Sequence, residues 1–433
     1  MIQSIKPAMI HSLKFTNFKN FQEAKLICGP LTLLMGTNAS GKSNVRDAFR
    51  FLHGIGRRYT LAEIVGEKYG PGGELVWDGI RGGVPEIAYC HADHFALEVA
   101  VDDLLDNAGP SCVYRIEIAP NYEDGQPQVV FESLCYGREQ IFEAKPISST
   151  PHILEISVFK RSGQDQPNFN AQKPALTQFA APFFGIWQFD TPENPERRKQ
   201  FETLIPKFID TLGNMRFLDI SSKVMRQPST PGQRILGDRG EHLASVLQTI
   251  CADPQRKAGL LSWLRSLTPM DVADLRFIPD FTGKVMLVLI ESGGQETSAY
   301  SASEGTLRLL VMLAALLGPQ SEQLFFFEEL ENGIHPSRLH LLLELIEKQV
   351  ARSQTQVIAT THSPQLLRLI SPETLENVSL VYRLEGQPDG HIRRLVDLPE
   401  SAKQVLQKKD ITHLYESGWF ENVVSFLAAE DEV

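Results

Sequence analysis

Gly36-Thr37-Asn38-Ala39-Ser40-Gly41-Lys42-Ser43 follows an apolar run at residues 31–35 and precedes residues 44–52, whose apolar positions have helical spacing. In such a strand–loop–helix context, the backbone N–H groups of residues 36–41 can surround phosphate oxygens, and the helix start adds the positive end of its dipole. Lys42 can neutralise the outer phosphates, and the Ser43 hydroxyl can ligate Mg²⁺. The octapeptide, together with Asn44, therefore predicts a nucleoside triphosphate site at the end of a strand in an α/β fold.

The composition is that of an ordinary globular protein. The chain has 433 residues, of which 42% are hydrophobic and 22% charged, and this size suits two or three domains or one large two-lobed domain. The net charge of −11 argues against a protein that coats nucleic acid by bulk charge, although it leaves a local basic groove open. The five cysteines form no C-x-x-C pair and fit reduced thiols better than disulfides or a zinc site.

The hydropathy pattern predicts a cytoplasmic protein without a membrane partner. The N-terminus lacks the apolar core of a secretory signal. The longest apolar run, residues 307–317, contains Arg308 and is too short to span a bilayer.

Three segments with different patterns define the expected domains. We expect an N-terminal lobe over residues 1–160, an inserted and mostly helical lobe over 161–275, and a C-terminal lobe over 276–433. Short strands are expected within 10–35, and alternating stretches within 84–160 predict an antiparallel sheet with one face in water. The polar stretch 163–168 marks the first boundary. Strands and helices alternate again after residue 285.

Two adjacent carboxylates follow the apolar strand predicted at residues 324–327. Glu328 and Glu329 lie at its carboxyl end, where open α/β sheets bind ligands. Because adjacent strand residues point to opposite faces, we expect Glu328 to face a Mg²⁺ ion and Glu329 to act as the general base on the attacking water. The alternative is a pair of solvated glutamates in a loop, which the unbroken apolar strand disfavours.

A second apolar strand, at residues 357–361, ends next to His362. A histidine beside a γ-phosphate can form a hydrogen bond with it and sense its loss. An isolated histidine is more often structural, but the matching position at a strand end favours a role in the site. We therefore group His362 with Glu329 as the expected catalytic residues.

A glycine-bearing helix start lies at Ser303-Glu304-Gly305-Thr306, ahead of the apolar helix expected at 307–317. Ser303 or Thr306 can serve as its N-cap. Such a helix start is also a second anion site, so Ser303 and Gly305 are further candidates for nucleotide binding. The motif is weak by itself, because every helix needs a cap.

The order of these segments resembles that of ABC-type ATPases of the SMC and RecF group, including the ATPase modules of OLD-like and other bacterial anti-phage proteins. Residues 13–21, with their Asn-Phe element, are similar to the family's first strand near the nucleotide base, and residues 36–43 are similar to its Walker A loop. Residues 303–306 resemble a shortened ABC signature, residues 328–336 resemble Walker B with the D-loop, and His362 matches the switch histidine. The resemblance covers about the first 60 and the last 150 residues, and it implies a two-lobed ABC-type fold.

The chain also departs from that family pattern. Glu328 stands where the family's Walker B has aspartate, and the Q-loop glutamine has no clear counterpart. No long coiled coil is inserted, so the chain is not an SMC-type tether. The segment after His362 has no D-x-D set, so a fused OLD-type Toprim nuclease is not expected.

The resemblance implies an ATP- and Mg²⁺-dependent ATPase in which two subunits enclose ATP and hydrolysis releases them. We expect a switch that regulates a separately encoded effector in bacterial anti-phage defence. The alternative is a RecF-like ATPase that binds DNA in repair. An ATPase subunit of a membrane transporter is disfavoured by the long insertion and the RecF-like start.

Overall fold

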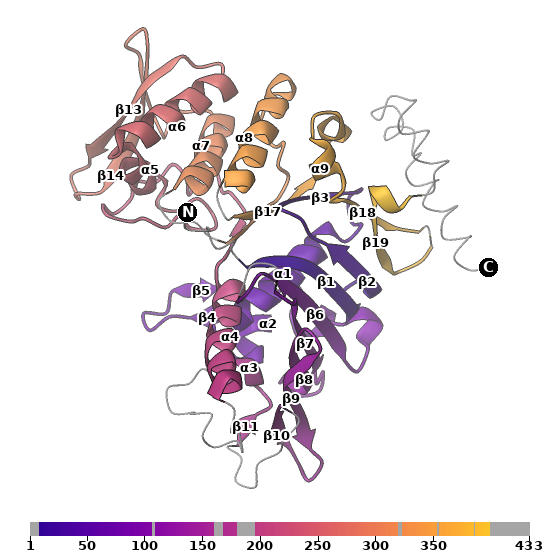
Figure 1. Ribbon diagram of the computed structural model, residues 1–433. Coiled ribbons are helices and arrows are strands. Elements are labelled where there is room, and N and C mark those ends of the chain that lie inside the picture. The colour runs from indigo at the N-terminus through magenta and orange to yellow at the C-terminus, as the bar shows by residue number, and fades with distance from the viewer. Residues whose placement is uncertain are drawn as a thin grey trace.

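A six-stranded sheet surrounds the strand that leads into the glycine-rich loop (Figure 1). The computed structural model describes residues 8–105, 109–159, 168–179, 195–318, 323–352, 355–384 and 386–398. The sheet has the order β12-β16-β17-β3-β18-β19, and only the last pair is antiparallel. Its strands are β3 (Leu31–Met35), β12 (Met215–Leu218), β16 (Leu324–Phe327), β17 (Gln356–Thr361), β18 (Val378–Arg383) and β19 (Gly390–Arg394).

Both faces of this sheet are buried, as is usual for parallel strands. Phe326 of β16 belongs to one hydrophobic cluster, and its neighbours Phe325 and Phe327 belong to the other. The first cluster joins the sheet to an antiparallel sheet, and the second joins it to a layer of helices. The unbroken apolar run of β16 therefore reflects burial on two sides.

The antiparallel sheet has eight strands in the order β11-β10-β9-β8-β7-β6-β1-β2. Along β7, buried and partly exposed residues alternate, so one face packs on the core and the other meets water. The strands are β1 (Met9–Phe18), β2 (Phe21–Ile27), β6 (Phe95–Asp102), β7 (Cys112–Ala119), β8 (Gln128–Tyr136), β9 (Glu139–Ile147), β10 (Thr150–Val158) and β11 (Phe169–Asn170).

Helix α1 (Lys42–Gly56) lies between the two large sheets (Figure 1). Phe49 packs against Phe326 of β16 with ring centroids 6.1 Å apart, and Phe51 packs edge-on against Phe95 of β6 at 5.6 Å. The other helices are α2 (Leu61–Val65), α3 (Ala175–Phe179), α4 (Pro195–Gly213), α5 (Leu243–Cys251), α6 (Pro254–Leu267), α7 (Glu304–Leu317), α8 (Leu339–Arg352) and α9 (Pro372–Leu375).

Two small sheets complete the described part. Strands β13 (Val272–Pro279), β14 (Val285–Glu291) and β15 (Glu296–Ser298) form an antiparallel sheet. They lie beside α5 and α6 at the upper left of Figure 1. The hairpin of β4 (Lys68–Tyr69) and β5 (Leu75–Trp77) projects from the lower part.

The structure confirms the α/β class, with a mixed sheet and a flanking antiparallel sheet. The short strands expected within residues 10–35 are β1, β2 and β3, and the first two are longer than expected, with ten and seven residues. The middle segment is more than a helical insertion, because its strand β12 pairs in parallel with β16 inside the central sheet. The three-part division by residue number stays a prediction. None of the helices in the described ranges has the length and apolar character needed to cross a membrane.

Candidate functional site

The glycine-rich loop is fixed by close backbone packing. Gly41 has a φ of 118°, and a Cβ there would lie 2.7 Å from the Nδ2 atom of Asn20. Asn20 in turn donates from Nδ2 to the Ser40 carbonyl at 3.1 Å, and its Oδ1 accepts from Asn44 Nδ2 at 2.6 Å. The turn between β1 and β2 therefore holds the loop at the start of α1, and position 41 requires glycine.

Lys42 is folded back over the loop that precedes it. Its Nζ atom donates to the carbonyl oxygens of Gly36 and Thr37, each at 2.7 Å. Burial lowers the pKa of Lys42 to about 8, and the nearby carboxylates of Glu331 and Glu329 oppose this shift. The ammonium group is therefore held at the mouth of the loop, where phosphates would arrive.

A pocket of about 360 Å³ opens beside the loop, a size suited to a small-molecule ligand. It brings together most of the residues that the sequence predicts. They are joined by Arg81 and Thr360, which sequence reasoning missed. The lining residues are Asn38, Ala39, Ser40, Gly41, Lys42, Ser43, Asn44, Arg81, Glu328, Glu329, Thr360 and His362.

The two carboxylates follow strand β16 and do not continue it. Glu329 has a φ of 49°, in the left-handed region, so the chain turns sharply at this residue. Its N–H donates to Thr360 Oγ1 at 2.9 Å, which fixes the turn against the end of β17. Glu328 and Glu329 both line the same pocket. The expectation that they point to opposite faces is therefore wrong, because strand alternation ends at Phe327.

Glu331 holds the backbone of the candidate switch histidine. Its Oε1 atom accepts a hydrogen bond from the His362 N–H at 2.7 Å. Burial and the charge of Lys42 lower the pKa of the His362 ring, while the Glu331 and Glu329 carboxylates oppose that shift. A neutral imidazole at pH 7 can both donate and accept hydrogen bonds, which suits a group that contacts a phosphate.

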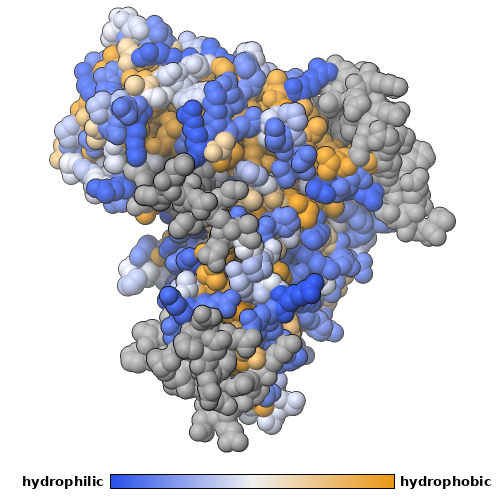
Figure 2. All heavy atoms as spheres, viewed as in Figure 1, coloured by the Kyte–Doolittle hydropathy of each residue, from blue (hydrophilic) through white to orange (hydrophobic). Residues whose placement is uncertain are grey.

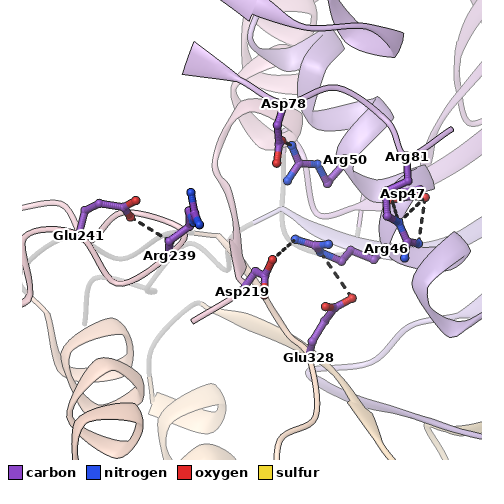
Figure 3. A network of polar contacts seen from close by, with 9 residues as sticks. All are labelled: Arg46, Asp47, Arg50, Asp78, Arg81, Asp219, Arg239, Glu241 and Glu328. Carbon is purple, nitrogen blue, oxygen red and sulfur yellow. Dashed lines mark hydrogen bonds and ion pairs between the residues drawn. The ribbon is translucent and has the colours of Figure 1, made fainter. Parts of the chain in front are cut away.

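A buried arginine connects the carboxylate strand to β12 (Figure 3). Arg46 of α1 places Nε 3.7 Å from a Glu328 oxygen and Nη2 3.9 Å from an Asp219 oxygen. In the same view Arg81 forms a two-armed ion pair with Asp47. Glu328 is therefore held beside a cation, and Arg81 is held at the rim of the pocket.

A second hollow of about 460 Å³ shares Asn44 and Arg81 with the first. It extends toward Lys19 and Asn20 in the turn between β1 and β2, and Tyr89 and Arg383 line it from other segments. The two hollows thus meet at Arg81.

The glycine-bearing helix start lies apart from this pocket. Ser303 is the N-cap of α7, and its Oγ accepts from Thr306 N at 3.1 Å, as the sequence predicts. Gly305 faces Gly333 so closely that a Cβ would lie 2.3 Å from the Gly333 carbonyl oxygen. Neither Ser303 nor Gly305 lines the pocket within the one chain.

The donor set at the loop fits a Mg²⁺ ion. Ser43 offers a hydroxyl oxygen and Glu328 a carboxylate oxygen in the same pocket. Mg²⁺ is usually held by one or two protein oxygens together with phosphate oxygens and water. These two residues would hold such an ion, which would neutralise phosphate charge.

One family model matches a part of the chain toward its C-terminus. Residues 263–368 match the family model described as "AAA domain, putative AbiEii toxin, Type IV TA system". That range contains Ser303, the two carboxylates at 328 and 329, and His362. No protein with a curated description matches the chain.

Solved structures of SMC heads are similar to the chain. An Smc head bound to the C-winged helix domain of ScpA shows 12% identity, covering 89% of this chain and 97% of that one, with a TM-score of 0.48. An SMC head domain from Thermotoga maritima shows 11% identity over 89% and 98%, with a TM-score of 0.41. An Smc head domain with an extended coiled coil, bound to the C-terminal domain of ScpA derived from Pyrococcus furiosus, shows 13% identity over 93% and 99%, with a TM-score of 0.48.

Proposed function

We propose that this chain binds ATP with Mg²⁺, hydrolyses it, and acts as a nucleotide-gated switch. The observation that carries the proposal is the convergence of the glycine-rich loop, Glu328, Glu329 and His362 on one pocket. These residues come from three neighbouring parallel strands, β3, β16 and β17, which end at the same edge of the sheet.

Each side chain has a definite task in this proposal. The loop amides and the start of α1 bind the β- and γ-phosphates, because the first N–H groups of a helix have no partner within it. Lys42 exchanges its contacts with the loop carbonyls for contacts with phosphate. Glu329 accepts a proton from the attacking water, and His362 donates to a γ-phosphate oxygen.

The proposed active unit contains two subunits, each of which completes the other's site. Ser303 and Glu304 are exposed at the start of α7, and Ser303 does not line its own chain's pocket. In a dimer related by a twofold axis, this helix start can reach the γ-phosphate bound by the partner subunit. Each pocket would then be incomplete in a monomer.

Ser303→Arg is expected to block turnover and leave ATP binding nearly unchanged. A long cation at the start of α7 opposes the helix dipole and fills the space for the partner's phosphate. ATPase activity per subunit should also rise with the concentration of wild-type protein. The measurements are steady-state turnover over a wide concentration range and equilibrium binding of a fluorescent ATP analogue.

Ser262→Arg is the control for that experiment, because Ser262 is an exposed residue on α6. Ser262→Arg should leave both ATP turnover and ATP binding unchanged. A wild-type protein that stays monomeric with ATP and has the same turnover at every concentration would contradict the dimer.

We further propose that ATP turnover controls a separately encoded effector in bacterial anti-phage defence. The description of the matching family names a putative toxin of a Type IV TA system. The net charge of −11 favours coupling to a protein over non-specific DNA binding.

Exposed apolar residues on the surface support docking of such a partner. Hydrophobic residues gather over the region of α8 and α9 in Figure 2, where Leu375 is 39% exposed. Ile235 in the middle segment is 43% exposed. The sequence also has Tyr415, Trp419 and Phe420 at helical spacing, which suits a further docking surface, and these residues lie outside the described ranges.

A pull-down from the host is expected to recover a protein partner, held differently by the ATP-bound and nucleotide-free forms. Mass spectrometry of the recovered material in each state gives the answer. The Lys42→Ala variant, which should bind ATP about a hundredfold more weakly, is the control and should behave as nucleotide-free at ATP concentrations that saturate only the wild type. A parallel DNA titration across salt concentrations tests the alternative. Tight, steeply salt-dependent DNA binding without a protein partner would favour the RecF-like repair function.

A further inference from the structure

One arginine binds three carbonyl oxygens of the loop that precedes α7. The Nη1 atom of Arg226 donates to Ala299 O at 3.0 Å, to Tyr300 O at 2.8 Å and to Ala302 O at 2.8 Å. We call residues 299–303 the pre-α7 loop. Its carbonyl groups converge on one cation, and that cation comes from a segment more than 70 positions earlier in the chain.

Arg226 adds to three backbone hydrogen bonds that hold the pre-α7 loop. Ala299 N donates to Leu287 O at 2.9 Å, and the N–H groups of Ser301 and Ala302 donate to Ser298 O at 3.0 and 2.9 Å. Ser301 and Ser303 are exposed, and the Tyr300 ring is 54% exposed, whereas Ala299 and Ala302 are buried. The Ser303 hydroxyl caps the helix internally through Thr306 N. The position of the exposed helix start therefore depends on the backbone before it, and Arg226 is the side chain that ties three of its carbonyl groups together.

The segment that carries Arg226 is itself anchored on both sides. The N–H groups of Asp219 and Ser221 donate to Asp238 O at 2.9 Å and Arg239 O at 3.0 Å. Ser229 exchanges two backbone hydrogen bonds with Val285 of β14, at 2.9 and 2.8 Å. A guanidinium group held on such a fixed backbone can define a geometry, because its donors lie in one plane.

The same segment begins at the nucleotide pocket. Asp219, directly after β12, forms the ion pair with Arg46, whose other neighbour is Glu328 (Figure 3). The segment that carries Arg226 therefore begins at the end of the central sheet. The pre-α7 loop and the pocket beside the glycine-rich loop are therefore both held by this segment within one chain.

We propose that Arg226 is a positioning residue that holds the pre-α7 loop for the nucleotide bound by a second copy of this chain. The inference rests on the proposed two-subunit function. Arg226 does not touch the reacting atoms. Its loss displaces the α7 start, and turnover falls in the partner's site while the pocket of the altered subunit stays intact.

Arg226→Ala is expected to lower turnover by about a hundredfold, since a displacement of about 1 Å around a reacting group has an effect of that size. Binding of a fluorescent ATP analogue should stay within about twofold of wild type, because the loop and Lys42 are untouched. Arg226→Lys keeps a cation that can donate to the same carbonyls and should recover part of the activity. Lys223→Ala, at an exposed position three residues away, is the matched control and should behave as wild type.

Mixing two inactive variants separates a positioning role from a merely structural one. In an equimolar mixture of Arg226→Ala and Lys42→Ala, half of the dimers contain one site with an intact pocket and an intact partner loop. The mixture should therefore recover about a quarter of wild-type activity per subunit if subunits exchange freely. Unmixed Arg226→Ala and Lys42→Ala should stay inactive at the same concentrations.

The outcomes distinguish this proposal from the dimer itself. Wild-type turnover that is independent of concentration contradicts the two-subunit function. A wild-type protein that dimerises, combined with a mixture that stays inactive, overturns the role of Arg226. If Arg226→Ala unfolds, as judged by its thermal midpoint against wild type, the mixing is done with the partly active Arg226→Lys. Activity of the mixture above the mean of the two unmixed variants then supports the role of Arg226, and activity equal to that mean overturns it.

Discussion

Lys42→Ala is expected to abolish ATP turnover, mainly because the phosphates are bound much more weakly. The ammonium group is the cation at the mouth of the loop, and it is already oriented by the carbonyl oxygens of Gly36 and Thr37. Its charge-assisted hydrogen bonds to phosphate contribute about 3 kcal/mol, which corresponds to about a hundredfold in Kd. Equilibrium binding of ATP and steady-state phosphate release measure the two effects.

Lys25→Ala is the matched control, because Lys25 is an exposed lysine on β2. It should bind and hydrolyse ATP as the wild type does. Thermal unfolding separates lost binding from lost folding. Without nucleotide, Lys42→Ala should unfold near the wild-type midpoint, and ATP should raise that midpoint only in the wild type and the control. Wild-type ATP affinity in Lys42→Ala would contradict the assignment of the pocket.

Local patterns in the sequence were enough to predict the elements that carry the site. The apolar runs at 31–35 and 324–327 are strands, and the helix start at Ser303 is capped as expected. These predictions succeeded because each depends on neighbours within a few positions. A strand that is buried on both faces is apolar throughout. An N-cap serine accepts a hydrogen bond from the N–H group of the residue three positions later.

Contacts between distant segments could not be predicted in the same way. Arg81 and Thr360 line the pocket, and Asp219 reaches Arg46, but no pattern around these residues marks them. Their roles depend on which strands become neighbours. Strand β12 lies beside β16 in the sheet. In the sequence, 105 residues separate Leu218, the last residue of β12, from Leu324, the first residue of β16.

The pair at 328 and 329 shows how a correct location can come with a wrong geometry. The apolar strand places both carboxylates at the sheet edge, as predicted. The sequence does not predict the left-handed backbone conformation of Glu329, because a non-glycine residue adopts this conformation only when neighbouring groups hold it there. At Glu329, the hydrogen bond from its N–H to the Thr360 hydroxyl on the neighbouring strand stabilises this conformation.

Glu329→Gln is expected to keep ATP binding and to slow the chemical step by about 10²-fold or more, the usual effect of losing a general base. The glutamine amide has nearly the same shape, and its oxygen can still accept from Asn332 Nδ2, which lies 3.1 Å from the present carboxylate. What disappears is the ability to take a proton from water. Because ATP would bind and not be cleaved, the variant should also accumulate as an ATP-bound dimer.

Single-turnover kinetics and size measurements with ATP test this expectation, and the neighbouring carboxylates provide the controls. Glu328→Gln removes a candidate Mg²⁺ ligand, so its defect should shift with Mg²⁺ concentration in the binding assay. Glu331→Gln keeps an oxygen that can accept from the His362 N–H and should cost far less than Glu329→Gln. Normal turnover in Glu329→Gln would show that the general base is another group. The base would then be Glu328 or Glu331, whichever loses the chemical step on substitution by glutamine while the variant still binds ATP.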